Sequence, residues 1–283
     1  MQKLMKGFRS VAFALCALPF AAMAEELPVV AYWRFDPDQP MRDDSGNVNN
    51  LVHSDDNHTD VIVEDGMVRY GANPACQLST EAILPLATLT NLTVRSEKMG
   101  KGIPVSIVLP ESYERGLTNY PCVYMLHGAG GSHARVDNPV VRGLADRYGL
   151  ILVAPDGGGQ GWWLDSPVKP DSQYETFVVG ELLPYVDARF RTQNVRAKRG
   201  IMGGSMGGHG ACYLGFRHKD LFGVVGIIYG GVDLMPWAGR WGLDECLGPR
   251  NEHPERWREH SVLQVAKTLK NGEIDLICTV GTE

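Results

Sequence analysis

The stretch Gly203-Gly204-Ser205-Met206-Gly207 decides the fold of this chain. A strand-like segment, residues 199–202, precedes it, and a helix-like segment, residues 208–222, follows it. A G-x-S-x-G run in this context is typical of a nucleophile elbow, a sharp turn that lifts a serine hydroxyl clear of a sheet. We therefore expect Ser205 to be a catalytic nucleophile. We also expect the backbone N–H of Met206 to face the oxyanion that forms on the substrate.

A second glycine-rich turn follows an earlier strand-like segment. Residues 122–126 are apolar and run directly into His127-Gly128-Ala129-Gly130-Gly131. An H-G-x-G-type loop after an early strand supplies the second oxyanion-hole N–H in enzymes that have a nucleophile elbow. The alternative is a simple glycine turn that ends a strand. We expect Ala129 to donate this N–H with Gly128 as its neighbour, and His127 to hold the loop by hydrogen bonds.

The sequence after residue 86 alternates between strand-like and helix-like segments. Several later strand-like segments are apolar throughout, which is typical of a sheet covered by helices on both faces. The alternation predicts a doubly wound α/β domain over residues 87–283. The expected strands are residues 92–95, 103–109, 122–126, 150–154, 200–202, 224–229 and 274–279. The expected helices are residues 138–148, 175–190, 208–222 and 261–270.

Residues 1–24 have the three parts of a secretory signal peptide. A positive start at Lys3, Lys6 and Arg9 is followed by an apolar run over residues 11–22. Ala22-Met23-Ala24 then matches a cleavage site. Because the apolar run is too short for a membrane span, we expect a secreted or periplasmic protein that is free of the membrane after cleavage.

Residues 25–86 predict a short β-rich segment with polar turns. They contain strand-like pieces at residues 29–35, 61–63 and 67–70, and no helical period. Residues 31–36 (AYWRFD) and 44–47 (DSGN) resemble the opening of concanavalin A-like, laminin G-like lectin domains. The resemblance covers only part of such a jelly roll. Two interpretations stay open: a sugar-binding module, and a structural edge packed on the next domain.

The composition excludes several classes of function. A net charge of −6 and a pI near 5.8 argue against binding to nucleic acid or to anionic membranes. No G-x-G-x-x-G or G-x-x-x-x-G-K-[ST] run occurs, so no nucleotide site is expected. The cysteine spacing fits no zinc motif, and the early aspartates fit no EF-hand loop. We therefore expect no metal and no organic cofactor, while the oligomeric state is not set by the sequence.

Residues 90–283 resemble the esterase D family, which includes S-formylglutathione hydrolases, tributyrin-type esterases, feruloyl and acetyl-xylan esterases, and mycolyltransferases. The matching pieces follow the family's order and spacing. They are residues 103–110 (IPVSIVLP), the His127 loop, residues 162–167 (WWLDSP), residues 181–184 (ELLP) and residues 203–208. The resemblance implies an α/β-hydrolase fold and ester hydrolysis through an acyl-serine intermediate. It also implies that Ser205 is the nucleophile and that Met206 and Ala129 are the oxyanion donors.

The same resemblance implies a catalytic acid and a catalytic histidine. The family's acid follows the strand that here covers residues 274–280, in a G-x-x-D turn, and its histidine comes after a further strand. Here the turn reads Gly281-Thr282-Glu283, and no histidine follows it. We therefore expect a C-terminally incomplete α/β-hydrolase that lacks the last strand and helix of its sheet. We expect this chain to be inactive by itself, because the acid and the histidine are absent.

Trp162 and Trp163 follow the glycine-rich run of residues 157–161 at the end of an expected strand. Ligands of α/β sheets bind at such strand ends. Two interpretations stay open for these tryptophans: they line an acyl or aryl pocket, or they are ordinary packing residues.

These features predict an exported serine carboxylesterase that hydrolyses acyl esters of small molecules or polysaccharides, with acetyl and feruloyl esters as candidate substrates. Two alternatives remain. One is an acyltransferase of the same fold, which passes the acyl group to a sugar or lipid hydroxyl. The other is a non-catalytic carbohydrate-binding protein with an inactive hydrolase domain.

Overall fold

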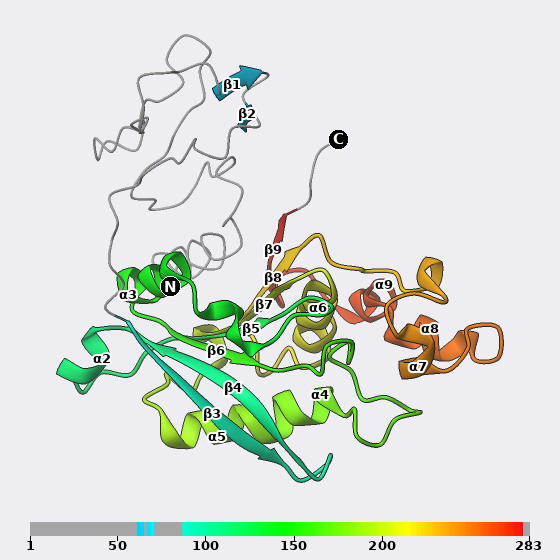
Figure 1. Ribbon diagram of the computed structural model, residues 1–283, viewed down its shortest axis with the longest axis horizontal. Coiled ribbons are helices and arrows are strands. Elements are labelled where there is room, and N and C mark those ends of the chain that lie inside the picture. The colour runs from blue at the N-terminus through cyan, green and yellow to red at the C-terminus, as the bar shows by residue number, and fades with distance from the viewer. Residues whose placement is uncertain (1–60, 65–66, 71–86, 280–283) are drawn as a thin grey trace. The chain divides into compact units, whose positions relative to one another are not determined.

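The computed structural model describes residues 61–64, 67–70 and 87–279 (Figure 1). The chain divides into two compact units, which we describe separately. In the first, β1 (Val61–Glu64) and β2 (Met67–Tyr70) pair antiparallel. Both coincide with strand-like pieces expected within residues 25–86. The expected signal peptide and lectin-like motifs lie outside the described residues.

The second unit is built on a sheet of seven strands in the order β3-β4-β6-β5-β7-β8-β9. β3 and β4 pair antiparallel, as do β4 and β6, and all neighbours from β6 to β9 are parallel. Each strand lies where the sequence predicted one, which confirms the α/β fold. The strands are β3 (Thr88–Ser96), β4 (Lys101–Leu109), β5 (Cys122–Leu126), β6 (Ile151–Pro155), β7 (Arg199–Gly204), β8 (Val224–Ile228) and β9 (Asp275–Thr279).

Helices cover both faces of this sheet, with α3 on one side and α4 and α5 on the other (Figure 1). The expected helix over residues 175–190 is a continuous helical run whose middle part, Phe177–Leu182, is π-helical. Three short helices, α2, α7 and α8, were not expected. The α-helices are α2 (Ser112–Arg115), α3 (Pro139–Tyr148), α4 (Tyr174–Thr176), α5 (Leu183–Arg189), α6 (Met206–Arg217), α7 (Leu243–Leu247), α8 (Pro254–His260) and α9 (Val262–Val265).

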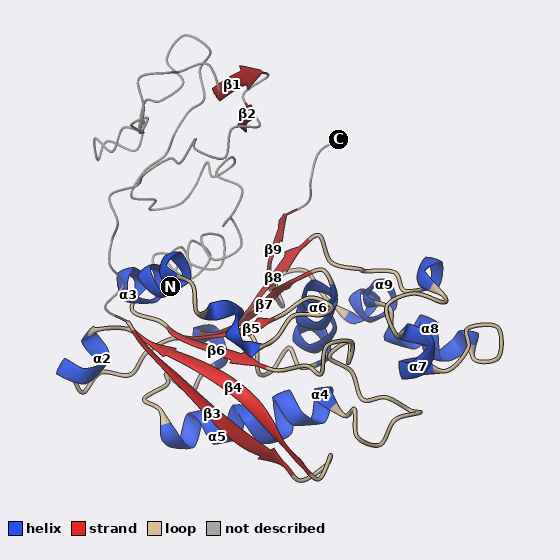
Figure 2. Cartoon of the chain, viewed as in Figure 1, coloured by secondary structure: helices blue, strands red, loops and turns tan. Residues whose placement is uncertain are grey.

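The connection between β8 and β9 contains α7, α8 and α9, which lie together on the side of α6 away from β3 and β4 (Figure 2). α8 begins at Pro254. Proline suits the first turn of a helix, because an N–H at that position would have no acceptor within the helix. Trp257 of α8 is fully buried, and its indole N–H donates to the carbonyl of Gly248 at 2.9 Å. This buried contact ties the connection into a packed lobe, which we call the α7–α9 lobe.

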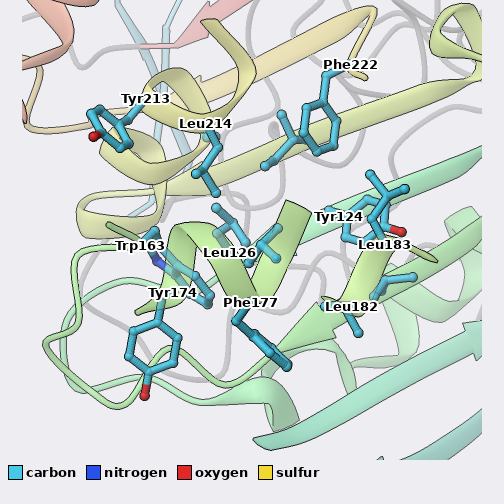
Figure 3. Packing of buried hydrophobic residues seen from close by; sticks show 14 of the residues in the cluster. Tyr124, Leu126, Trp163, Tyr174, Phe177, Leu182, Leu183, Tyr213, Leu214 and Phe222 are labelled. Carbon is cyan, nitrogen blue, oxygen red and sulfur yellow. The ribbon is translucent and has the colours of Figure 1, made fainter. Parts of the chain in front are cut away.

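Aromatic side chains from several elements fill the core between the sheet and helices α4 to α6 (Figure 3). Tyr124 of β5 meets Phe222 edge-on, with ring centroids 5.9 Å apart. Trp163 is fully buried and lies against α6 at Gly210. A Cβ added to Gly210 would lie 2.5 Å from three side-chain atoms of Trp163. α6 therefore packs on this indole without any space for a larger residue.

Gly210→Ala is expected to lower the free energy of unfolding by about 1–3 kcal/mol, because overpacking would displace Trp163 or the helix. Gly180→Ala is the matched control. Its added Cβ would meet nothing closer than Thr176 Cγ2 at 3.9 Å, so we expect no loss and a gain of up to about 1 kcal/mol. Urea unfolding of both variants measures the difference, and equal stability would contradict the packing of Trp163 on α6.

Candidate active site

Ser205 occupies a sharp turn between the last residue of β7 and the first residue of α6. Its φ is 55° and its ψ is −120°, a strained conformation for a residue with a side chain. Ser205 is exposed, whereas the next residue, Met206, is buried. Strain of this kind persists only where the surrounding structure enforces it, and it clusters at functional positions. The turn therefore has the strand-turn-helix geometry of a nucleophile elbow.

The glycines on either side of Ser205 are required by the end of β5. A Cβ on Gly207 would lie 2.0 Å from the carbonyl oxygen of Leu126, and one on Gly203 would lie 2.5 Å from the same atom. Contacts this short with backbone atoms cannot be relieved by side-chain movement. The two glycines thus allow β5, β7 and α6 to approach closely enough to form the turn.

The loop after β5 lies directly beside Ser205. A Cβ on Gly128 would be 3.4 Å from the Cβ of Ser205. The carbonyl of Gly128 accepts a hydrogen bond from Gly131 N–H at 3.0 Å, which closes a tight turn with Ala129 and Gly130 at its centre. Gly130 has φ 71°, a value that favours glycine. The structure thus places Gly128 beside Ser205 and Ala129 in the same turn, and the role of Ala129 as an oxyanion donor stays a prediction.

Met206 supplies a backbone N–H on the other side of Ser205. As the first residue of α6, it has no acceptor for this N–H within the helix. The amide also sits at the positive end of the helix dipole, which favours negative charge. An oxyanion formed beside Ser205 would therefore meet a donor that is already oriented.

His127 fixes the oxyanion loop rather than facing Ser205. Gly157 N–H donates to its Nε2 at 2.8 Å, so Nδ1 carries the hydrogen and donates to the carbonyl of Gly128 at 2.8 Å. Burial lowers the pKa of His127, so the neutral ring that makes both bonds is favoured. Both ring nitrogens are occupied, which agrees with the expected structural role.

Trp162 and Trp163 are buried, with 3% and 0% of their surfaces exposed. The indole N–H of Trp163 donates to the carbonyl of His127 at 3.1 Å, and that of Trp162 donates to the carbonyl of Trp241 at 2.9 Å. Their contacts are therefore those of packing residues. Both indoles are thus packed in the described core, and a part for either of them in a substrate pocket stays a prediction.

Tyr229 lies near Ser205 and was not singled out as a site residue from the sequence. It directly follows β8, whose last residue, Ile228, accepts a hydrogen bond from Ser205 N–H at 3.0 Å. Tyr229 is 58% exposed at φ 37°, and a Cβ on Gly204 would lie 3.7 Å from its hydroxyl oxygen. The one available signal was its place at the carboxyl end of an apolar, parallel strand.

His209 is buried beneath the elbow, one turn of α6 after Ser205. Its ring stacks on that of Tyr213 with centroids 5.6 Å apart, and Tyr213 in turn stacks on His260 with centroids 5.7 Å apart. The Nε2–H of His209 donates to the carbonyl of His260 at 2.9 Å, which ties α6 to the α7–α9 lobe. Burial lowers the pKa of His209 to about 4, so the ring is neutral near pH 7.

No histidine in the described part of the chain is hydrogen-bonded to Ser205. Their ring partners lie elsewhere: the loop backbone for His127, Ser106 for His133, the carbonyl of His260 for His209, Glu175 for His218, Glu255 for His253, and the carbonyl of Arg256 for His260. The described residues thus bring together a serine and two candidate oxyanion donors without a general base.

Within residues 87–279 and the β1–β2 pair, no group of three or more His, Cys, Asp or Glu side chains is arranged to hold a metal ion. None of the described helices combines the length and the apolar character that crossing a bilayer requires.

Comparison with protein families matches residues 96–283 to the family described as "Putative esterase". The matched region contains both the Ser205 turn and the His127 loop.

Curated relatives of known name match parts of the chain. Two esterases from strains of Mycobacterium tuberculosis are each 38% identical over 112 residues, which is 38% of this chain and 24% of each relative. An endo-1,4-beta-xylanase/feruloyl esterase of Xylanibacter ruminicola is 26% identical over 158 residues, which is 50% of this chain and 22% of that protein. The chain thus spans about a quarter of the length of these relatives.

Solved structures share the fold. An S-formylglutathione hydrolase from Agrobacterium tumefaciens aligns with a TM-score of 0.58 at 20% identity, covering 72% of this chain and 89% of that one. A ferulic acid esterase aligns with a TM-score of 0.55 at 21% identity, covering 70% and 91%. These likenesses confirm the α/β-hydrolase fold that the sequence predicted.

The free energy of unfolding is expected to fall as the pH drops from about 6.5, the pKa of an unfolded histidine, towards the value of about 4 for buried His209. In this window the unfolded chain binds a proton that the folded protein does not, so acid favours unfolding. The His209 contribution is at most about 3 kcal/mol, because each pKa unit corresponds to about 1.4 kcal/mol.

His209→Gln tests this linkage, because glutamine retains an N–H for the carbonyl of His260 but does not titrate. Urea unfolding at pH 7.0 and near pH 4.5 gives the loss of stability for each protein. The loss is expected to be smaller in the variant than in the wild type. An equally steep loss in both proteins would contradict a buried, neutral His209.

Proposed function

This chain belongs to the esterase family that its residues 96–283 match, and we propose that it is a serine carboxylesterase with Ser205 as its nucleophile. The observation that carries the proposal is the exposed Ser205 at φ 55°, between β7 and α6 and against the Gly128–Gly131 turn. Two backbone amides, those of Ala129 and Met206, flank the position where a substrate oxyanion would form. Ser205 is also the one serine, threonine or cysteine among the described residues that has a positive φ.

The reaction follows from this arrangement. Oγ of Ser205 attacks the ester carbonyl carbon and loses its proton to a base, and the carbonyl oxygen becomes an oxyanion. Ala129 and Met206 N–H groups donate to it, and each such donor typically contributes about 3–4 kcal/mol to transition-state stabilisation. The tetrahedral intermediate then collapses and the bond to the alcohol oxygen breaks. The alcohol leaves with the proton that the base took from Ser205, and an acyl-serine remains. Water then attacks the acyl carbon, the acid departs, and Ser205 regains its hydrogen.

The proton of Ser205 needs an acceptor from outside the described residues. Every described histidine makes its contacts elsewhere, and His127 and His209 are engaged with backbone groups. We therefore expect hydrolysis that relies on the described residues alone to be slow, since general base catalysis typically contributes a factor of about 10²–10⁴. A diffusible base small enough to reach the exposed Ser205 should restore part of that factor.

The substrate class is proposed from two supports. The sequence of residues 1–24 has the form of a secretory signal, which favours a substrate outside the cytoplasm. One relative is named an endo-1,4-beta-xylanase/feruloyl esterase. We infer that the natural substrates are acyl esters of sugars, with acetyl and feruloyl groups as the candidate acyl parts.

The test measures hydrolysis of p-nitrophenyl acetate by the wild type and by Ser205→Ala at increasing imidazole concentration. The imidazole-dependent rate of the wild type is expected to exceed that of Ser205→Ala by about tenfold or more, because imidazole can accept the proton of Ser205. Ser112→Ala, a serine on α2 away from the elbow, is the control and should behave as the wild type. Identical rates for wild type and Ser205→Ala at every imidazole concentration would overturn the proposed nucleophile.

A further inference from the structure

Trp241 is an exposed tryptophan held in a strained conformation. Its φ is 50°, and 47% of its surface is exposed. A bulky residue at positive φ is an outlier that the structure must enforce. The ring of Trp237 lies beside it, with centroids 4.8 Å apart and planes inclined by 40°. We call these two indoles the tryptophan pair.

One buried indole connects the tryptophan pair to the elbow helix. The carbonyl of Trp241 accepts the indole N–H of Trp162 at 2.9 Å. The Trp162 ring lies edge-on to His209 of α6, with centroids 5.4 Å apart, and a Cβ on Gly231 would meet it at 3.7 Å. Gly231 follows Tyr229 by two residues. The Trp162 side chain thus contacts both Trp241 and α6, the helix that follows Ser205.

A second connection runs to the oxyanion loop. A Cβ on Gly242 would lie 2.4 Å from Oε1 of Gln160, so the residue after Trp241 packs tightly against that side chain. Gln160 belongs to the loop after β6, in which the carbonyl of Gly159 accepts from Gly130 N–H at 2.8 Å. The tryptophan pair therefore borders the loop that holds the Gly128–Gly131 turn in place.

Polar residues lie close to Trp241 along the chain or pack against its neighbours. Arg240 directly precedes Trp241 and is exposed. Asp244 accepts a hydrogen bond from Gly239 N–H, which fixes its carboxylate within the same turn. The Gln160 side chain packs against Gly242, the residue after Trp241. An exposed, flat indole among such polar residues suits a ring with C–H groups on its face and hydroxyls around its edge.

We propose that the tryptophan pair binds a sugar ring of the ester's alcohol part, with Trp241 as the stacking surface. The C–H groups of a pyranose face gain dispersion contacts with the indole, and its hydroxyls stay in water or reach the neighbouring polar side chains. The assignment of this sugar to the alcohol part of the ester rests on the proposed function. The half-exposed surface favours a sugar over an aryl acyl group, because a sugar keeps hydroxyls in water whereas apolar ligands are mostly enclosed by their pockets.

The test uses unesterified sugar, so that binding is measured without any reaction. Native gel electrophoresis is run with and without soluble, unesterified xylan in the gel. Xylan is expected to retard the wild type and Ser205→Ala equally. Trp241→Ala is expected to raise the apparent dissociation constant about tenfold or more, as for other anchoring tryptophans. Trp241→Tyr, which restores a flat ring, should recover part of the retardation.

Leu263→Ala is the matched control, because Leu263 is 49% exposed on α9 in the same lobe. It should be retarded as strongly as the wild type, and thermal unfolding should show that all variants are folded. Equal retardation of wild type and Trp241→Ala, or no retardation of the wild type, would overturn the proposal. A third outcome would also overturn it. In that case calorimetry would show that methyl ferulate binding depends on Trp241, while xylan binding does not. Xylan binding is measured without any reaction and is expected also for Ser205→Ala. A failure of the esterase proposal would therefore leave the result of the xylan experiment unchanged.

Discussion

The close approach of α6 to the end of β5 is the constraint on which the rest of the structure depends. The carbonyl oxygen of Leu126 lies only 2.0 Å from the position that a Cβ of Gly207 would occupy. With the two elements this close, the chain passes from β7 into α6 through one strained residue, and the exposed Ser205 is that residue. The strain is maintained by packing, since β5, β7 and α6 are all covered by the buried core.

The same contact brings the remaining site groups together. The residues that follow Leu126 form the Gly128–Gly131 turn, so the loop with Ala129 must lie beside Ser205. His127 and Trp163 then hold this loop from behind, through the carbonyls of Gly128 and His127. One packing arrangement thus places Ser205, the proposed nucleophile, next to the elements that carry both proposed backbone donors, and such preorganisation is usually the largest contribution to this kind of catalysis.

The sequence predicted most of the fold because its signals were local. Short strand-like segments, several of them apolar throughout, predicted all seven strands of the main sheet, and the G-x-S-x-G run predicted the position of Ser205. Short helices such as α7, with five residues, carry too little periodicity to be recognised. The strain at Tyr229 and Trp241 was not predictable either, because positive φ at an aromatic residue is imposed by distant packing and not by its neighbours in sequence. For the same reason, the burial of Trp162 and Trp163 could be seen only in the structure.

Covalent trapping at Ser205 tests the central claim most directly. The chain is incubated with a fluorophosphonate ester in the presence of imidazole and digested with trypsin. The peptide between Arg199 and Arg217, residues 200–217, contains Ser205 as its single serine. We predict a phosphonyl adduct on Ser205, located by fragment masses, and no such peptide adduct in Ser205→Ala. An adduct confined to other residues, or a Ser205 that stays unmodified while other serines react, would contradict the claim that this turn presents an activated nucleophile.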